Sequence, residues 1–154
     1  ICDLREPETL ASRNRCYYLG TNPNPRLVGD HNPVLPRQLA LRGRGAGDGH
    51  ALHLTIEDDL DAGTAAGRIH HTELRLRLSD YKDLKERIHL AVNGQRIPFE
   101  PDRTIANDKG DQWLVFDDPG LCAGSNSVLL ILEGASTPKP WPVLHNLEAM
   151  VICA

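Results

Sequence analysis

The chain has 154 residues, which is enough for one globular domain, since domains most often hold about 100–150 residues. Hydrophobic residues make up 40% of it and charged residues 25%, and these proportions exclude a disordered or fibrous chain. The formal net charge of −4 argues against a nucleic acid partner, and no apolar run approaches the roughly 18 residues that membrane insertion needs.

The first 33 residues carry few signals of regular structure. Residues 6–11 favour one or two helical turns, because Pro7 stands where a first turn accepts proline. Residues 16–19 (CYYL) are the strand candidate of this region. Residues 21–33 (TNPNPRLVGDHNP) contain three prolines and predict a long loop. We therefore expect residues 1–33 to form an irregular N-terminal arm or flap.

Strand patterns then follow one another at short intervals, each bounded by Gly, Pro, Asn or Asp. The strand candidates are residues 34–43, 50–57, 69–79, 87–92, 95–99, 112–117, 127–133 and 143–153. Between two of them, residues 58–67 favour a short helix with an aspartate N-cap and a glycine at its end. This pattern is typical of an all-β domain, which we place at residues 34–154.

The clearest strand is residues 69–79, in which leucines alternate with charged residues. Leu74, Leu76 and Leu78 face one way, and Glu73, Arg75 and Arg77 face the other. We expect the leucines in the core and the charged side chains in solvent, although Arg75 and Arg77 could meet the carboxylates of a partner. Residues 127–133 (SVLLILE) are apolar on both faces, which predicts a central strand.

A hairpin is predicted at residues 87–99. Ile88, Leu90 and Val92 alternate with less apolar residues, and Asn93-Gly94 then suits a two-residue turn that needs positive φ. The predicted core list is Leu74, Leu76, Leu78, Ile88, Leu90, Val92, Leu130 and Leu132. Loops too short for crossover helices predict an all-β fold: a two-sheet antiparallel β-sandwich of jelly-roll type.

Several of these features carry a resemblance to a known family. They are the Asn93-Gly94 hairpin, Trp113 with Phe116, the turn at residues 124–126 and the final strand at 147–152. Through them, residues 68–153 resemble the galactose-binding-domain-like β-sandwich modules of extracellular bacterial glycoside hydrolases and surface proteins. The resemblance implies the fold above all. It also implies a carbohydrate ligand, and a structural calcium ion that loop carboxylates would hold.

The chain has four cysteines, Cys2, Cys16, Cys122 and Cys153, and none of them forms a CxxC pair of the kind that binds metal. Their even number and the two at the chain ends suit disulfides in an oxidising compartment, and unpaired buried thiols are the alternative. We predict no free thiols, with Cys2 and Cys153 each bridged, and an extracellular or cell-surface location. The sequence does not choose among the possible pairings.

Catalysis has no local support, because the chain lacks a nucleophile motif. Its paired carboxylates at 58–61, 108–111 and 117–118 lie beside turn residues, where aspartate binds its own backbone. We expect no enzyme and no cofactor except a possible calcium ion at Asp58, Asp59 and Asp61, for which a helix N-cap is the competing interpretation. The histidines at 50, 53, 70 and 71 do not favour zinc.

Two functions fit these predictions. The first is a non-catalytic extracellular structural module that associates with copies of itself, as in a filament or surface layer, or with a neighbouring domain through its arm and edge strands. The alternative is a carbohydrate-binding module of an extracellular enzyme or adhesin. Its candidate platforms for stacking on sugars are Trp141, Tyr17, Tyr18 and Tyr81.

Overall fold

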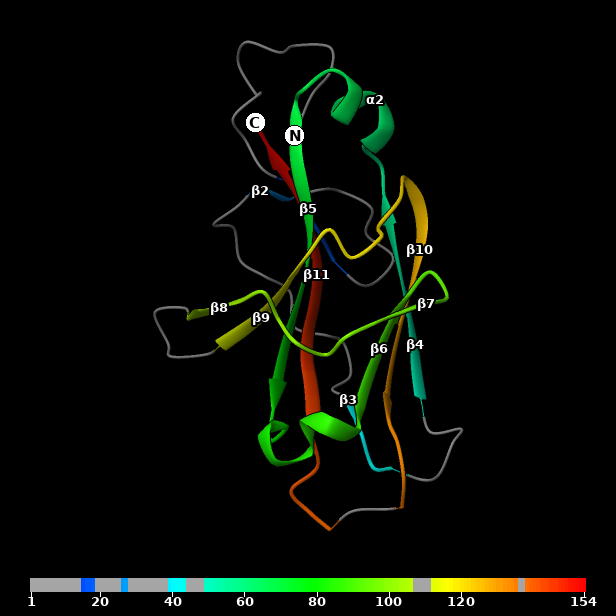
Figure 1. Cartoon of the computed structure of the whole chain (residues 1–154), viewed down its shortest axis with the longest axis vertical. Coiled ribbons are helices and arrows are strands. Elements are labelled where there is room, and N and C mark those ends of the chain that lie inside the picture. The colour runs from blue at the N-terminus through cyan, green and yellow to red at the C-terminus, as the bar shows by residue number, and fades with distance from the viewer. Residues whose placement is uncertain (1–14, 19–25, 28–38, 44–48, 107–111, 136–137) are drawn as a thin grey trace.

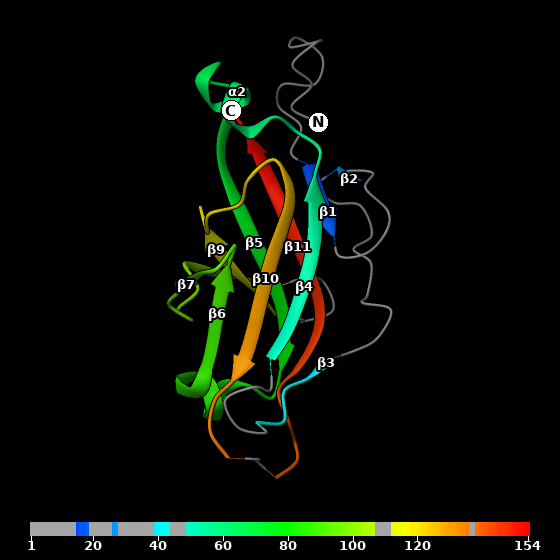
Figure 2. The same ribbon diagram turned by 90° about the vertical axis from the view of Figure 1, so that its right-hand side faces the viewer.

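The chain folds into two antiparallel sheets packed face to face (Figure 1). The computed structural model describes residues 15–18, 26–27, 39–43, 49–106, 112–135 and 138–154, and for 15–18, 26–27 and 49–50 it describes the backbone alone. Figure 1 shows β5, β9 and β11 on one side and β4, β6 and β10 on the other, and Figure 2 views these two layers face on. The predicted all-β, two-sheet sandwich is confirmed.

The larger sheet, here sheet A, has seven strands. In order across the sheet they are β2 (Arg26–Leu27), β1 (Arg15–Tyr18), β11 (Val143–Cys153), β5 (Ile69–Ser79), β9 (Gln112–Asp117) and β8 (Arg103–Ala106), with β3 (Leu39–Ala40) also on β11. The smaller one, sheet B, runs in the order β4 (Gly49–Ile56), β10 (Gly124–Leu132), β6 (Ile88–Val92) and β7 (Gln95–Ile97). Helix in the described residues is limited to α2 (Leu60–Ala65) and the 3-10 helix η1 (Lys82–Arg87).

The core fills the space between the sheets and contains every residue predicted for it. Leu74, Leu76 and Leu78 of β5 belong to one buried cluster with the inward side chains of sheet B. The predicted members from sheet B are Ile88, Leu90, Val92, Leu130 and Leu132. Burial of this apolar surface is the main force that holds the two sheets together.

The β6–β7 hairpin turns at Asn93-Gly94 as predicted. Asn93 has φ 51° and Gly94 has φ 82°, while Val92 pairs with Gln95 across the turn. The side chain of Asn93 has a second role that the sequence pattern did not indicate. Its Oδ1 accepts a hydrogen bond from the Ser127 backbone N–H at 2.9 Å, so the turn is fastened to β10.

Other elements differ from the predictions. The predicted strand 95–99 ends at Ile97 because Pro98 follows and has no backbone N–H to donate. The predicted loop 21–33 is wrong at Arg26–Leu27, which pair with β1 as β2. The strand predicted at 34–43 is seen as β3, Leu39–Ala40, and residues 34–38 lie outside the described part. The helix predicted at 6–11 also lies outside it. Neither β8 nor η1 was predicted.

The chain changes sheets between β7 and β8. Because β7 belongs to sheet B and β8 to sheet A, residues 98–102 cross from one layer to the other, as Figure 1 shows. This crossing and η1 frame the hollow described next. No helix among the described residues is long and apolar enough to cross a membrane.

Candidate functional site

A cleft of about 650 Å³ opens where η1, β6, β7 and the crossing meet. Because Leu90 pairs with Ile97, extending the register of the hairpin brings Ile88 close to Phe99, and η1 directly precedes Ile88. The cleft is lined by Tyr81, Lys82, Lys85, Glu86, Ile88, His89, Arg96, Ile97, Pro98, Phe99, Glu100 and Pro101. Its volume lies within the range of about 300–1,000 Å³ that is typical of small-molecule sites.

Two aromatic rings give the cleft an apolar wall of fixed orientation. The half-buried Tyr81 and Phe99 rings meet edge to face, with centroids 6.2 Å apart and an interplanar angle of 87°. Phe99 in turn lies 5.8 Å from the ring of Phe116, a member of the core cluster. The chain of contacts from the core through Phe99 therefore orients the Tyr81 ring before any ligand arrives.

Charged side chains line the rest of the cleft. Lys82, Lys85 and Glu86 come from η1, and Glu100 comes from the crossing. Polar groups around an apolar wall are what orient a ligand in sites of this kind.

A second arrangement on the cleft lining involves Arg96, whose guanidinium contacts the His89 imidazole at Nδ1. The other ring nitrogen, Nε2, lies 2.6 Å from Glu133 Oε2. The same guanidinium nitrogen of Arg96 also lies 3.2 Å from Nε2. His89 therefore lies between the guanidinium of Arg96 and the carboxylate of Glu133.

The predicted sugar-stacking residues are separated by the structure. Tyr81 lines the cleft. Trp141 is not part of the cleft lining. Two cationic side chains lie over its ring, with Arg42 Cζ 4.5 Å and Lys139 Nζ 4.9 Å from the ring centroid. Tyr17 and Tyr18 belong to β1, where only the backbone is described. Of the two whose side chains are described, Tyr81 is the one that lies on the cleft beside other aromatic and charged side chains.

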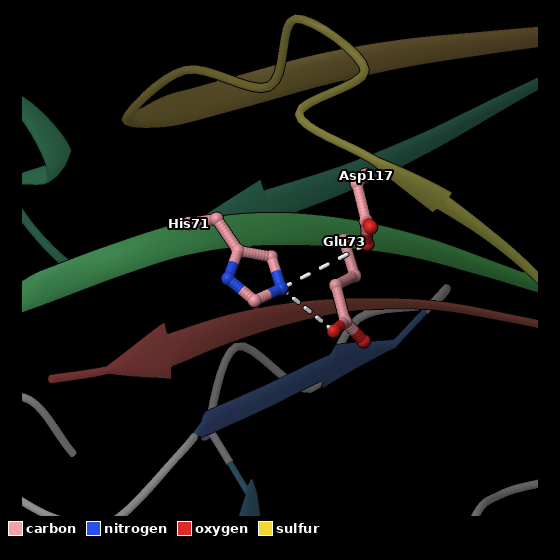
Figure 3. Close-up of side chains that lie close together, drawn as sticks. All are labelled: His71, Glu73 and Asp117. Atoms are coloured by element: carbon pink, nitrogen blue, oxygen red, sulfur yellow. Dashed lines mark hydrogen bonds and ion pairs between the residues drawn. The ribbon is translucent and has the colours of Figure 1, made fainter. Parts of the chain in front are cut away.

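A cluster of charged side chains lies on the outer face of sheet A, centred on Glu73 (Figure 3). His71 Nε2 is 2.9 Å from Glu73 Oε1 and 3.7 Å from Asp117 Oδ1. Arg75 Nη2 lies 2.7 Å from Glu73 Oε2. Arg103 contacts Glu73 with one nitrogen and Asp117 with the other, which lies 2.6 Å from Oδ1. The cluster thus joins β5, β8 and β9.

The ionised form of Glu73 is stabilised in this cluster. Burial of the side chain, which is 2% exposed, would by itself raise its pKa. Hydrogen bonds from His71 and Arg75 and the positive charges of Arg75 and Arg103 outweigh that effect, so the pKa of Glu73 lies below its ordinary value. Hydrogen bonding to Asp117 contributes most to a raised pKa of Arg103.

His71, Glu73 and Asp117 form the group of possible metal ligands found in the described residues. A cation would have to displace the guanidinium of Arg103 from both carboxylates and that of Arg75 from Glu73. Because two arginines already balance the two acids, this cluster fits an ion-pair network that fastens three strands better than a metal site.

The cluster corrects two predictions. Arg75 and Arg77 were expected in solvent, but Arg75 is 17% exposed and binds Glu73, while Arg77 Nε donates to the buried Asn146 at 2.6 Å. The sequence pattern could not show that a polar face would be covered. Asp117 was assigned to a turn, but it is the last residue of β9 and binds Arg103.

Of the three aspartates proposed to bind calcium, one caps a helix. Asp59 is the N-cap of α2, and its Oδ1 accepts a hydrogen bond from the Ala62 N–H at 3.0 Å. Asp58 and Asp61 flank this cap, and the three do not gather as ligands in the described structure. His70 and His71 make an edge-to-face ring contact with centroids 4.9 Å apart.

The cysteines depart from the prediction that none is free. Cys122, which lies in the loop before β10, has a free and exposed thiol. Cys153 takes part in a disulfide, and its partner lies outside the described side chains. Cys2 and the side chain of Cys16 are also outside the described part.

Apart from Tyr81, the residues of the cleft were not found by sequence reasoning. A usable signal was present, because the two-residue turn at Asn93-Gly94 fixes which residues face each other across the hairpin. Continuing that register beyond Ile97 places Phe99 near Ile88 and the residues of η1 near the crossing. What could not be foreseen is η1 itself, which brings Tyr81 against Phe99.

Comparisons with known proteins give little further. No protein-family model matches the chain, and no curated protein matches it. It is similar to a β-porphyranase of glycoside hydrolase family 86 from the human gut bacterium Bacteroides plebeius, with 14% identity and a TM-score of 0.43 over 91% of this chain. It is also similar to BuGH86wt, solved in complex with neoagarooctaose, with 16% identity and a TM-score of 0.43 over 90% of this chain.

This chain spans only 29% and 27% of the lengths of those two chains. TM-scores this low carry no argument about the fold or the cleft, both of which rest on the sheets and side chains described above. The β-sandwich is confirmed by its own sheets. Membership of the galactose-binding-domain-like family stays a prediction.

Proposed function

We propose that the chain is a carbohydrate-binding module of an extracellular enzyme or adhesin, without catalytic activity of its own, and that the glycan binds in the cleft. The observation that carries the proposal is the placement of Tyr81 on an existing cleft, with its ring oriented by Phe99. An aromatic face of this kind stacks on the apolar face of a sugar ring.

The lining of the cleft supports the proposal in a second way. Sugars combine apolar C–H faces with many hydroxyl groups, so a glycan site needs an apolar wall beside hydrogen-bonding groups. Tyr81 and Phe99 supply the wall, and Lys85, Glu86 and Glu100 supply donors and acceptors. Because the ring orientation is fixed by packing, little ordering entropy is lost on binding.

The test is isothermal titration calorimetry of the folded chain with a panel of soluble polysaccharides and their oligosaccharides. We expect at least one to bind. Tyr81→Ala should weaken that binding at least about tenfold, whereas Tyr81→Phe, which keeps the ring, should retain most of it. Trp141→Ala is the matched control at the other predicted platform and should leave the affinity unchanged.

Three results would contradict parts of the proposal. Absence of binding to every polysaccharide would overturn it as a whole. Loss of binding in Trp141→Ala but not in Tyr81→Ala would move the site to Trp141. Release of new reducing ends from the bound polysaccharide would overturn the non-catalytic part and direct attention to Glu86 and Glu100, the carboxylates of the cleft.

Self-association, the first of the two functions predicted from the sequence, is not part of this proposal. It relied on open edge strands and on residues 1–33 lying across a neighbouring molecule. Within that region, β1 pairs with β11 of its own chain along four residues, from Arg15 opposite Val151 to Tyr18 opposite Glu148. The other residues of the predicted arm, apart from β2, lie outside the described part, and light scattering would measure the oligomeric state directly.

A further inference from the structure

We propose that the ligand of the cleft is an anionic glycan, whose carboxylate or sulfate groups are bound by Lys82, Lys85 and Arg96. This inference rests on the proposed function, and it names the class of glycan. It begins from the lysines of η1, whose ammonium groups form no ion pair or hydrogen bond within the described residues. Unpaired cations on a cleft wall are free to meet an anion.

Arg96 adds a third cation whose charge no carboxylate neutralises directly. The group in contact with its guanidinium is the imidazole of His89, and Glu133 lies on the far side of that ring. The contact with His89 holds Arg96 on the cleft lining, and no carboxylate pairs with its guanidinium within the described residues. The guanidinium has five N–H donors in a planar fork, and this geometry suits carboxylate and sulfate oxygens.

The charges of the lining favour an anion even when its acids are counted. The cleft has three cations, Lys82, Lys85 and Arg96, against two carboxylates, Glu86 and Glu100. The excess is therefore one positive charge, whereas the whole chain has a formal net charge of −4. A neutral glycan would desolvate these cations without replacing their hydration by an opposite charge, while an anionic glycan would form charge-assisted hydrogen bonds with them.

The carboxylates of Glu86 and Glu100 can also contact an anionic glycan in this cleft. A sugar residue that bears one acidic group still has several hydroxyl groups, and a carboxylate accepts hydrogen bonds from hydroxyls. The apolar wall at Tyr81 and Phe99 remains available to the C–H face of the ring. The lining thus distinguishes a glycan from an acidic peptide, which would leave Glu86 and Glu100 facing further carboxylates.

The experiment measures affinity for matched pairs of polymers by isothermal titration calorimetry. Polygalacturonate is paired with its methyl-esterified form, and a sulfated galactan with its desulfated form, so that carboxylate and sulfate are tested separately. We expect one anionic polymer to bind at least about tenfold more tightly than its neutral partner. Raising NaCl from about 0.05 M to about 0.5 M should reduce that preference, because salt screens exposed charges.

Variants assign the effect to the cleft. Arg96→Gln and the double variant Lys82→Gln/Lys85→Gln should each bring the ratio of the affinity for the anionic polymer to that for its neutral partner close to one. Lys139→Gln removes the same charge beside Trp141, outside the cleft lining, and should change nothing. Circular dichroism and urea unfolding check that each variant is folded.

The outcomes separate the two proposals. Equal binding of neutral and anionic partners, with no effect of the lysine and arginine variants, would overturn the anionic class and leave carbohydrate binding intact. Binding of no glycan at all would overturn both. Binding of polyglutamate as tight as that of the anionic glycan would show a general polyanion or acidic-peptide site and would also overturn the inference.

Discussion

Glu73 shows how a single residue can be both buried and charged. Its carboxylate receives hydrogen bonds from His71 and Arg75 and an ion pair from Arg103, so each oxygen has a partner. A buried charge is tolerated when it is paired and hydrogen-bonded, and removal of one partner leaves the others uncompensated. The residue therefore connects the stability of sheet A to its state of ionisation.

The first prediction concerns the acid sensitivity that follows. The pKa of Glu73 is lower in the folded chain than its ordinary value, so its stabilising effect is fully present above that ordinary value and is lost as pH falls through the folded pKa. Urea unfolding between pH 7 and about pH 3 should show the wild type losing more stability than Glu73→Gln. At pH 7 the variant itself should be less stable by about 3 kcal/mol.

Glu57→Gln is the matched control, because Glu57 is exposed and lies outside the cluster. It should follow the wild type at every pH. If the wild type and Glu73→Gln lose stability in parallel, the ionised form of Glu73 is not stabilised by folding.

At the scale of the element, strands were easiest to predict from the sequence where large apolar residues are dense. The strands β5, β9 and β11 were predicted with the bounds that they have, since leucines alternate from Leu74 to Leu78 in β5, and apolar residues are four in a row in β9 and the majority in β11. The four residues of β8 are a short edge strand in which Ile105 alone is a large apolar residue, so no pattern marked them. The start of β10 was missed for a similar reason, since residues 124–126 are Gly, Ser and Asn.

The candidate site was less accessible to such reasoning than the strands. Tyr81 could be proposed from its chemistry alone, but the cleft needs η1 and the crossing to meet at the end of a hairpin. Neither element has a periodic pattern, because η1 is a short 3-10 helix of mostly charged residues and the crossing contains two prolines. The covered polar face of sheet A escaped prediction because alternation of leucine and arginine looks the same on exposed and covered faces.

A second prediction tests the two faces of the sandwich. Leu76 in β5 is fully buried, and truncation to alanine should lower the free energy of unfolding by about 2–5 kcal/mol, as for other buried leucines. Leu129 in β10 is half-buried on the other face of its strand, and Leu129→Ala should cost less than half as much. Chemical denaturation of both variants measures the difference. A near-neutral Leu76→Ala would show that β5 does not face the core.

At the scale of the whole molecule, the cleft depends on both sheets. One wall belongs to sheet B through β6 and β7, and another is the crossing at residues 98–101, which leads to β8 of sheet A. Phe99 links that crossing to Phe116, inside the core. The geometry of the site therefore exists only while the two sheets remain packed, and a ligand in the cleft stabilises the folded chain against global unfolding.

A third prediction follows from this dependence. A glycan that binds the native chain and not the unfolded chain should raise the free energy of unfolding by about 2.7 kcal/mol at a concentration of about 100 times its Kd. In urea unfolding, the midpoint should move to higher urea while the slope stays the same. Tyr81→Ala, with its Kd raised at least about tenfold, should show a shift of no more than about 1.4 kcal/mol at the same glycan concentration. An equal shift in Tyr81→Ala would place the bound glycan outside the cleft.

The position of β11 in the sequence has a consequence for how the chain acquires its structure during synthesis. This strand pairs with β1, β3 and β5, yet it is the last of the strands to be made, and Leu147 must find Leu76, 71 residues earlier in the chain. Until β11 leaves the ribosome, β5 and β1 each lack one of their neighbours in sheet A, and β3 lacks the strand with which it pairs. The nascent chain thus exposes an unpaired edge of the leucine-rich β5 until β11 is made, a period in which chaperones or a slow pace of elongation would protect it from aggregation.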